Sequence, residues 1–111
     1  MKIINHTKNV LITEKLLIPT TLLDQFLGLL KHKKPTAMLF KTRFGIHTFG
    51  MHYAIDVLIL DKENNVVAMK ENMLPNKIFL WNPKYETVLE LPTETIKIKK
   101  INLGDILKFS K

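Results

Sequence analysis

The feature that most constrains the fold is a polar pentapeptide, DKENN (61–65), with a strongly apolar run on each side. The run before it, IHTFGMHYAIDVLIL (46–60), and the run after it, VVAMK (66–70), are rich in branched and aliphatic side chains, which favour strands. Asn64 and Asn65 tolerate the positive φ angles that tight turns require. The pattern predicts an antiparallel hairpin, and with it a sheet as the main element of the fold.

The other strands are predicted from shorter apolar runs, namely KIIN (2–5), VLIT (10–13), TAMLFK (36–41), residues 78–80, ETVLEL (86–91) and ILKF (106–109). The first two flank the polar tetrapeptide HTKN, so we expect them to pair as a hairpin. Gly104 and Asp105 predict the turn that leads into the last strand.

Two helical segments are expected among these strands. PTTLLDQFLGLLKHKK (19–34) has threonines at its start, lysines at its end and leucines on one face, which favours a helix packed on a sheet. TETIKI (93–98) predicts one helical turn near the C-terminus, capped by Thr93. The expected fold is mainly β, a β-sandwich or a flattened, jelly-roll-like barrel with one packed α-helix near the N-terminus. With 111 residues and no linker, residues 1–111 should form a single domain.

Composition excludes several classes of chemistry and of targeting. The chain has no cysteine, so disulfides and thiolate nucleophiles or ligands are excluded. Its N-terminus lacks the apolar core of a signal peptide, and no run is long enough to span a membrane. We therefore expect a cytoplasmic protein without a membrane partner or cofactor, present as a monomer or a weak homo-oligomer.

The formal net charge of +7 raises the question of nucleic-acid binding. The 17 basic residues include a single arginine, Arg43, which argues against recognition of base edges. Candidate nucleic-acid contacts lie in two basic clusters and comprise Lys31, Lys33, Lys34, Arg43, Lys97, Lys99 and Lys100. A solvated lysine-rich surface is the preferred interpretation, and weak, non-specific contact with polyanions is the alternative.

Several short motifs, in order along the chain, resemble those of one known family. They are Gly28-Leu29-Leu30, Met38-Leu39-Phe40, His47-Thr48-Phe49-Gly50-Met51, Ile55-Asp56-Val57, Leu60-Asp61, Val88-Leu89-Glu90-Leu91 and Gly104-Asp105. On these the sequence resembles the domain of unknown function 192 family over residues 22–109. The sequence departs from the family pattern at Leu30, Ala37, Ala54 and Glu94, and His52 stands where the family usually has arginine or lysine. The resemblance implies a compact, mostly β fold of sandwich type and no established activity.

Polar residue types gather in the stretch HTFGMHYAIDVLILD (47–61). In one continuous strand, His47 and Met51 would share a face, whereas His52 and Asp56 would share the other face about 13 Å apart. A bulge at Gly50 would shift this alternation and could bring both histidines to one side. The sequence leaves these alternatives open.

Four interpretations of this stretch follow. In the preferred one the residues are structural: Asp56 and Asp61 accept loop amides, Met51 packs in the core, and His47 bonds to a backbone carbonyl or a carboxylate. In the second, a groove binds a small ligand or a protein partner, with candidate residues His47, Met51, His52, Asp56, Trp81 and Glu90. In the third, His47 acts with Asp56 or Glu90 in a hydrolase-like enzyme. In the fourth, a soft metal is held by the histidines and by methionines drawn from Met38, Met51, Met69 and Met73.

Overall fold

The predicted hairpin lies in the central sheet of the molecule. In the computed structural model, which describes residues 1–18, 36–43 and 45–110, the hairpin consists of β6 (Ile55–Leu60) and β7 (Val66–Met73). The two strands pair antiparallel, and Asn64 in the connecting turn has a φ of 64°. The hairpin prediction is confirmed, although of the two asparagines Asn64 alone has a positive φ.

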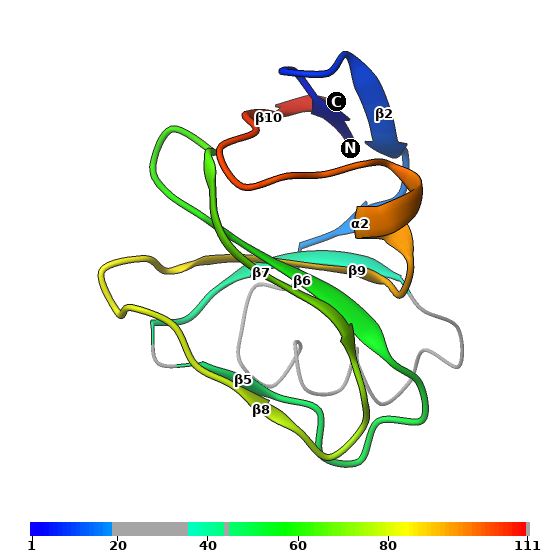
Figure 1. Cartoon of the computed structure of the whole chain (residues 1–111), viewed down its shortest axis with the longest axis vertical. Helices are drawn as coiled ribbons and strands as arrows, with labels where there is room; N and C mark the ends of the chain where they lie inside the picture. The colour runs from blue at the N-terminus through cyan, green and yellow to red at the C-terminus, as the bar shows by residue number, and fades with distance from the viewer. Residues whose placement is uncertain (19–35, 44, 111) are drawn as a thin grey trace.

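The described elements form three sheets (Figure 1). The remaining elements are β1 (Lys2–Asn5), β2 (Val10–Thr13), β3 (Leu16–Leu17), β4 (Ala37–Lys41), β5 (Ile46–His47), β8 (Ile78–Phe79), β9 (Thr87–Pro92), α2 (Thr95–Ile98) and β10 (Leu107–Ser110). The central sheet has the order β3-β4-β9-β6-β7, a second sheet has the order β10-β1-β2, and β5 pairs with β8. All pairs between these strands are antiparallel except β3 with β4. The mainly β prediction is confirmed, but the central sheet is open at β3 and β7, so the flattened barrel is wrong for the described strands.

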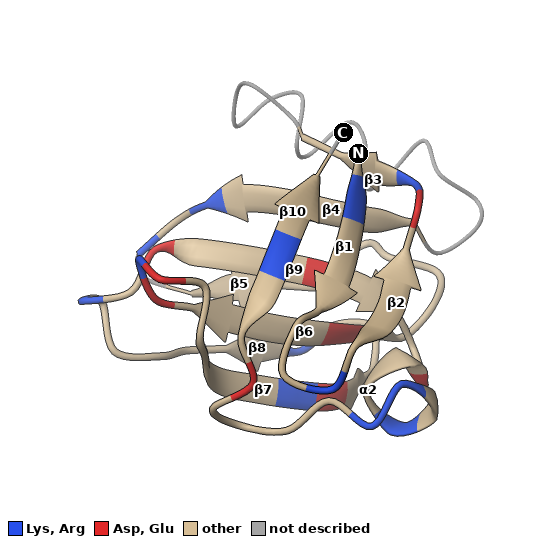
Figure 2. Ribbon diagram, turned by 90° about the horizontal axis from the view of Figure 1, so that it is seen from above, with Lys and Arg blue, Asp and Glu red and all other residues tan. Residues whose placement is uncertain are grey.

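The first core fills the space between the two larger sheets. Figure 2 shows β10, β1 and β2 crossing over the strands of the central sheet. The buried residues of this core come from both sheets and from the segment around α2, and they are Ile3, Ile12, Ala37, Leu58, Leu60, Val66, Leu89, Leu91, Ile96, Ile101 and Leu107.

The second core covers the opposite face of the central sheet. β6 sends Ile55, Val57 and Ile59 to this side and Leu58 and Leu60 to the first core. Both faces of β6 are therefore buried, which is why its sequence reads as a continuous apolar run. The short β5–β8 sheet contributes Ile46 and Phe79 to the second core.

Asp105 fixes β10 against the N-terminal hairpin. Its buried carboxylate accepts hydrogen bonds from Asn5 Nδ2 at 2.8 Å, Lys8 Nζ at 2.5 Å and the Asn102 amide at 2.9 Å. Burial acts to raise the pKa of Asp105, but these hydrogen bonds and the charge of Lys8 outweigh it and hold the pKa below its ordinary value. The network ties the two ends of the chain together.

The apolar run 46–60 does not form one strand. β5 ends at His47, and Thr48–Met51 make a turn in which the Met51 amide donates to the Thr48 carbonyl at 3.1 Å. Gly50, third in this turn, has a φ of 79°, as a type II turn requires and as glycine adopts without steric cost. Both alternatives for this stretch, a continuous strand and a strand with a bulge at Gly50, are therefore wrong, because Gly50 is a turn residue between β5 and β6.

The two helix predictions have different outcomes. The helix predicted for residues 19–34 lies outside the described residues. The predicted C-terminal helical turn is confirmed as α2, but the cap is wrong, because Glu94 with a φ of 76° precedes the helix. The Thr93 hydroxyl instead donates to Asn72 Oδ1 at 3.1 Å.

Candidate functional site

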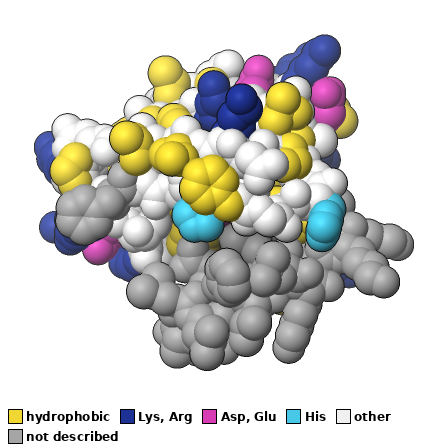
Figure 3. All heavy atoms as spheres, turned by 90° about the horizontal axis from the view of Figure 1, so that it is seen from below, with side chains coloured by type: hydrophobic (Ala, Val, Ile, Leu, Met, Phe, Trp, Pro, Cys, Tyr) yellow, Lys and Arg dark blue, Asp and Glu magenta, His cyan; other side chains and the backbone are white. Residues whose placement is uncertain are grey.

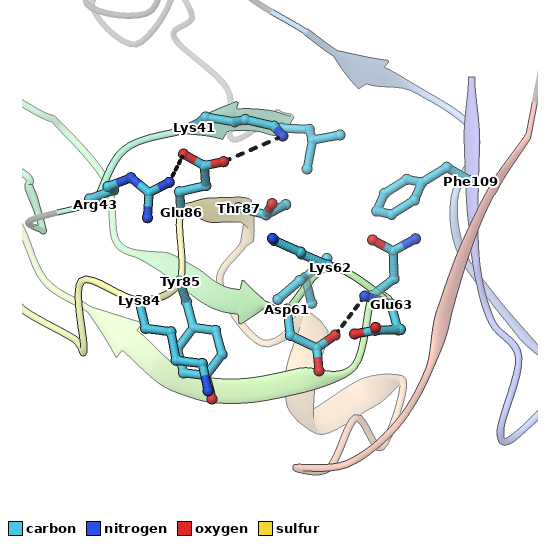
Figure 4. A pocket seen from close by; sticks show the side chains of 13 residues that line it. Lys41, Arg43, Asp61, Lys62, Glu63, Lys84, Tyr85, Glu86, Thr87 and Phe109 are labelled. Atoms are coloured by element: carbon cyan, nitrogen blue, oxygen red, sulfur yellow. Dashed lines mark hydrogen bonds and ion pairs between the residues drawn. The ribbon is translucent and has the colours of Figure 1, made fainter.

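A pocket of about 610 Å³ opens where three strands of the central sheet end. The strand register places Lys41 at the end of β4, Thr87 at the start of β9 and Leu60 at the end of β6 in one row. Phe109 of β10 lines the pocket from the facing sheet (Figure 4). The pocket therefore takes its walls from segments that are far apart in the sequence.

The floor of the pocket is apolar. Leu60 belongs to the first core, and Leu39 and Phe109 pack against that core from the two sheets. An organic group placed on these side chains would lose contact with water on one side, which is the main source of affinity in small-molecule sites.

The β6–β7 turn forms one wall and is held rigidly. The Asp61 carboxylate accepts the amides of Glu63 at 3.0 Å and Asn65 at 2.8 Å, and the Asn65 side chain at 2.9 Å. Burial acts to raise the pKa of Asp61, but these hydrogen bonds and the nearby charge of Lys84 outweigh it, so the pKa lies below its ordinary value. The Leu107 amide also donates to the Asn64 carbonyl at 3.0 Å, which anchors the turn to the last strand.

Glu86 organises the opposite rim. Its carboxylate lies 3.1 Å from an Arg43 guanidinium nitrogen and 3.8 Å from Lys41 Nζ. Arg43 also donates to the Pro83 carbonyl at 3.1 Å. These pairs are solvent-exposed, so they orient the cations more than they stabilise the fold.

Lys62 presents a cation to the pocket. Figure 4 shows its side chain reaching into the pocket from the β6–β7 turn. In the part of the chain that the structure describes, every ion pair involves Lys8, Lys41 or Arg43, so Lys62 has no carboxylate partner. Of the other two lining lysines, Lys41 faces Glu86 and Lys84 lies 5.7 Å from the centre of the Tyr85 ring. A lysine that forms no ion pair within the described residues, over an apolar floor, suits a ligand that carries one anionic group.

Comparison with known proteins places the chain in a family. The model of the domain of unknown function 192 family, described as "Uncharacterized ACR", matches residues 3–109. The chain belongs to this family. The match confirms the resemblance predicted from the sequence motifs and extends it over the first strands.

Solved structures of similar fold carry no settled activity. A protein from Sinorhizobium meliloti 1021, provisionally described as a transcription regulator, is 17% identical with a TM-score of 0.75, over 96% of this chain and 89% of that one. A protein of unknown function from Novosphingobium aromaticivorans DSM 12444 is 16% identical with a TM-score of 0.73, over 85% of this chain and 74% of that one. At sequence identities this low, the similarity establishes a shared fold and nothing about function. No curated protein matches the chain.

None of the ligand-binding residues predicted from the sequence lines the pocket at the end of the central sheet. Met51 is buried in the second core, Trp81 packs against that core, and Glu90 is buried on the strand between Met38 and Val57. The Trp81 indole donates to the Tyr85 carbonyl at 2.8 Å, which gives it a structural partner. As ligand-binding residues this set stays a prediction.

Asp56 performs the structural role expected of it. One carboxylate oxygen accepts the Asn72 amide at 2.8 Å, and the other accepts the Ile96 amide at the start of α2, also at 2.8 Å. With 1% of its surface exposed, Asp56 has both oxygens committed to backbone donors. It is therefore not available as the carboxylate partner of a catalytic histidine.

His47 and His52 are both exposed. His47 Nδ1 accepts the Phe49 amide at 3.3 Å, and the two rings stack with centroids 4.8 Å apart. Among the described residues no histidine forms an ion pair with a carboxylate. No three His, Asp or Glu side chains in these same ranges lie close enough together to hold a metal ion. The catalytic hypothesis thus has no assembled histidine–carboxylate pair in the described residues, and binding of a soft metal by histidines and methionines stays a prediction.

The candidate nucleic-acid contacts that the structure describes come from two segments, one at Arg43 and one around α2. Arg43 is engaged by Glu86, Lys97 and Lys100 are exposed around α2, and Lys99 is half-buried. Lys31, Lys33 and Lys34 lie outside the described residues. None of the described helices is long and apolar enough to cross a membrane.

Sequence reasoning missed Lys62 and the pocket around it. The segment DKENN was recognised as a turn, but its lysine was not considered as a binding residue. The available signal was a lysine directly after a buried strand, next to an aspartate that can fix the turn. The pocket itself depends on the register of β4, β9 and β6, which cannot be predicted from the residue pattern of the sequence.

Proposed function

We propose that this member of the domain of unknown function 192 family binds a small organic anion in the pocket at the end of the central sheet. The observation that carries the proposal is Lys62, a cation that forms no ion pair within the described residues and lies on a hydrogen-bonded turn above an apolar floor. A site that is already rigid loses little entropy when a ligand binds. The facing sheets support the interpretation of the fold as an open β-sandwich, with the pocket at one end.

The pocket also limits the kind of ligand. A volume of about 610 Å³ lies within the range typical of small-molecule sites, which favours a metabolite-sized compound over a polymer. The apolar floor of Leu39, Leu60 and Phe109 favours a ligand with an aliphatic or aromatic body. The Lys62 ammonium favours a carboxylate or phosphate group at one end, because charge-assisted hydrogen bonds are the strongest of their kind.

A ligand screen tests the proposal. We expect aromatic and aliphatic carboxylates or phosphates to raise the Tm of the protein, whereas neutral compounds of the same shape leave it unchanged. Replacing Lys62 with methionine should weaken binding of the best ligand about tenfold to a hundredfold, because one charge-assisted hydrogen bond is lost. Isothermal titration calorimetry on the wild type and the variant measures the change.

Lys70→Met is the matched control, because Lys70 is an exposed lysine on β7 that does not line the pocket. Its affinity for the ligand should equal that of the wild type. If the Lys62→Met variant binds the ligand as tightly as the wild type, Lys62 does not bind the anionic group. If no anionic compound raises the Tm of the wild type, the proposed function is wrong.

A further inference from the structure

Thr48 connects the turn after β5 to the loop before β8 through hydrogen bonds. Its amide donates to the Lys77 carbonyl at 2.9 Å, and its hydroxyl donates to the Leu74 carbonyl at 2.7 Å. In return its hydroxyl oxygen accepts the Lys77 amide at 2.9 Å, and its carbonyl accepts the Asn76 amide at 3.1 Å. Thr48 is fully buried. The turn after β5 and the loop before β8 therefore form one rigid unit.

Gly45 brings the two strands of this unit close together. Its φ is 141°, and a Cβ atom at this position would lie 2.6 Å from Leu80 Cδ2 and 2.8 Å from the Phe79 carbonyl oxygen. No other residue type could sit here without moving β8. The close approach fixes Leu80 beside β5.

The outer side of this unit is apolar and exposed. Four apolar residues of the β5–β8 unit are exposed, by 48%, 51%, 61% and 68%, and they are Phe49, Leu74, Ile78 and Leu80. We call these four residues the hairpin surface, after the β5–β8 strand pair and not after the β6–β7 hairpin. Figure 3 shows apolar side chains gathered on this face of the molecule. The ring of His47, which is paired with Ile78 across the two strands, stacks on Phe49. Exposed apolar residues are usually scattered, so a rigid group of four marks an interaction surface.

The two chain segments that carry the hairpin surface contain one lysine and no carboxylate. Its four residues lie within residues 45–54 and 72–82, and these two segments also contain His47, His52 and Lys77. The same segments contain no aspartate and no glutamate. An apolar surface with Lys77 in the same segment is complementary to an apolar partner that carries a carboxylate.

We propose that the hairpin surface docks a segment of a partner protein that presents apolar side chains next to aspartate or glutamate. The apolar side chains cover Phe49, Ile78 and Leu80, and a carboxylate pairs with Lys77. Because Thr48 and Gly45 fix the surface before the partner arrives, little ordering is needed on binding. The surface lies outside the set of residues that line the pocket, so this docking does not depend on the proposed ligand.

A second copy of the chain is a poorer occupant. In a two-fold dimer the same surface patch meets itself, so each copy would bring a lysine and two histidines and no carboxylate from these segments. Lys77 of one copy would then find no carboxylate in these segments of the other copy. The charge pattern favours a different, acidic partner.

Selection of random displayed peptides on the immobilised full-length protein tests the proposal. We expect the enriched peptides to combine aromatic or aliphatic residues with aspartate or glutamate. Binding of a synthetic copy, measured by fluorescence anisotropy, should weaken at least about tenfold in the Ile78→Ser/Leu80→Ser variant, because apolar contact area is lost. Ile98→Ser/Leu103→Ser is the matched control, since Ile98 and Leu103 are 69% and 60% exposed outside this surface.

A charge exchange tests the pairing with Lys77. The Lys77→Glu variant should bind the acidic peptide several-fold more weakly, and a peptide with lysine in place of its acidic residues should recover that loss. Lys77 is exposed, so this variant should fold even where the double serine variant does not. The proposal is overturned if no peptide is enriched, or if the enriched peptides lack acidic residues. It is also overturned if the Ile98→Ser/Leu103→Ser control loses as much peptide affinity as Ile78→Ser/Leu80→Ser. Dimerisation of the wild type that disappears in Ile78→Ser/Leu80→Ser would assign the surface to a second copy and overturn it as well.

Discussion

The Asp56→Ala variant is expected to lose about 3 to 5 kcal/mol of unfolding free energy. The Asp56 carboxylate accepts two backbone amides, from Asn72 at the end of β7 and from Ile96 at the start of α2. Alanine leaves both donors without a partner, and the Ile96 hydrogen bond is buried. Urea unfolding followed by circular dichroism and by Trp81 fluorescence measures the change.

Thr93→Ala is the matched control for this prediction. It removes the hydrogen bond from the Thr93 hydroxyl to the Asn72 side chain, which is exposed to solvent. Its cost should stay below about 0.5 kcal/mol. Hydrogen exchange should also become faster at the Ile96 amide in Asp56→Ala and stay unchanged in Thr93→Ala. If the two variants unfold at the same urea concentration, the structural role of Asp56 is wrong.

Local chemistry explains which strands could be predicted. The β6–β7 turn is readable because its stabilising contacts lie within Asp61 to Asn65, where the aspartate accepts amides two and four residues ahead. The break after β5 has a different cause. It depends on hydrogen bonds between Thr48 and residues 74–77, more than twenty positions away. The pattern of apolar residues along the chain does not reveal such a distant contact. For this reason residues 46–60 look like one strand in the sequence.

The same distinction applies to the candidate site. The sequence identified Asp56 and Asp61 as acceptors of loop amides and Met51 as a core residue, and the structure confirms all three roles. It did not identify the pocket, because Lys62 and Phe109 meet only after β6 and β10 have been placed in facing sheets. Residue types predict a chemical role where the partner is the nearby backbone. They do not predict a cavity formed by distant segments.

Glu90 is the remaining polar group in the second core. It is 2% exposed and lies on β9 between Met38 of β4 and Val57 of β6. One of its carboxylate oxygens has no hydrogen-bond partner among the described residues. Burial raises the pKa of Glu90 from 4.5 to about 7. The charged form is disfavoured because its surroundings are apolar and the described residues provide no cation for it.

Stability should therefore fall as pH rises through the range set by Glu90. Between about pH 4.5 and 7 the folded protein keeps a proton that the unfolded chain releases, so the unfolding free energy decreases with pH and levels off above 7. The two pKa values correspond to a loss of about 3 kcal/mol. Glu90→Gln cannot ionise, so its advantage over the wild type should grow from pH about 5 to about 8.5 by a similar amount.

Urea unfolding of the wild type and of Glu90→Gln across this range isolates the contribution of Glu90, because every other titrating group is common to both proteins. Glu71→Gln is the matched control, since Glu71 is an exposed carboxylate on β7 and its removal should leave the pH dependence of the wild type unchanged. Parallel curves for the wild type and Glu90→Gln would mean that Glu90 is already ionised in the folded protein at low pH. A cation or hydrogen-bond donor would then have to reach the carboxylate inside the second core, since an apolar environment alone cannot stabilise the charge.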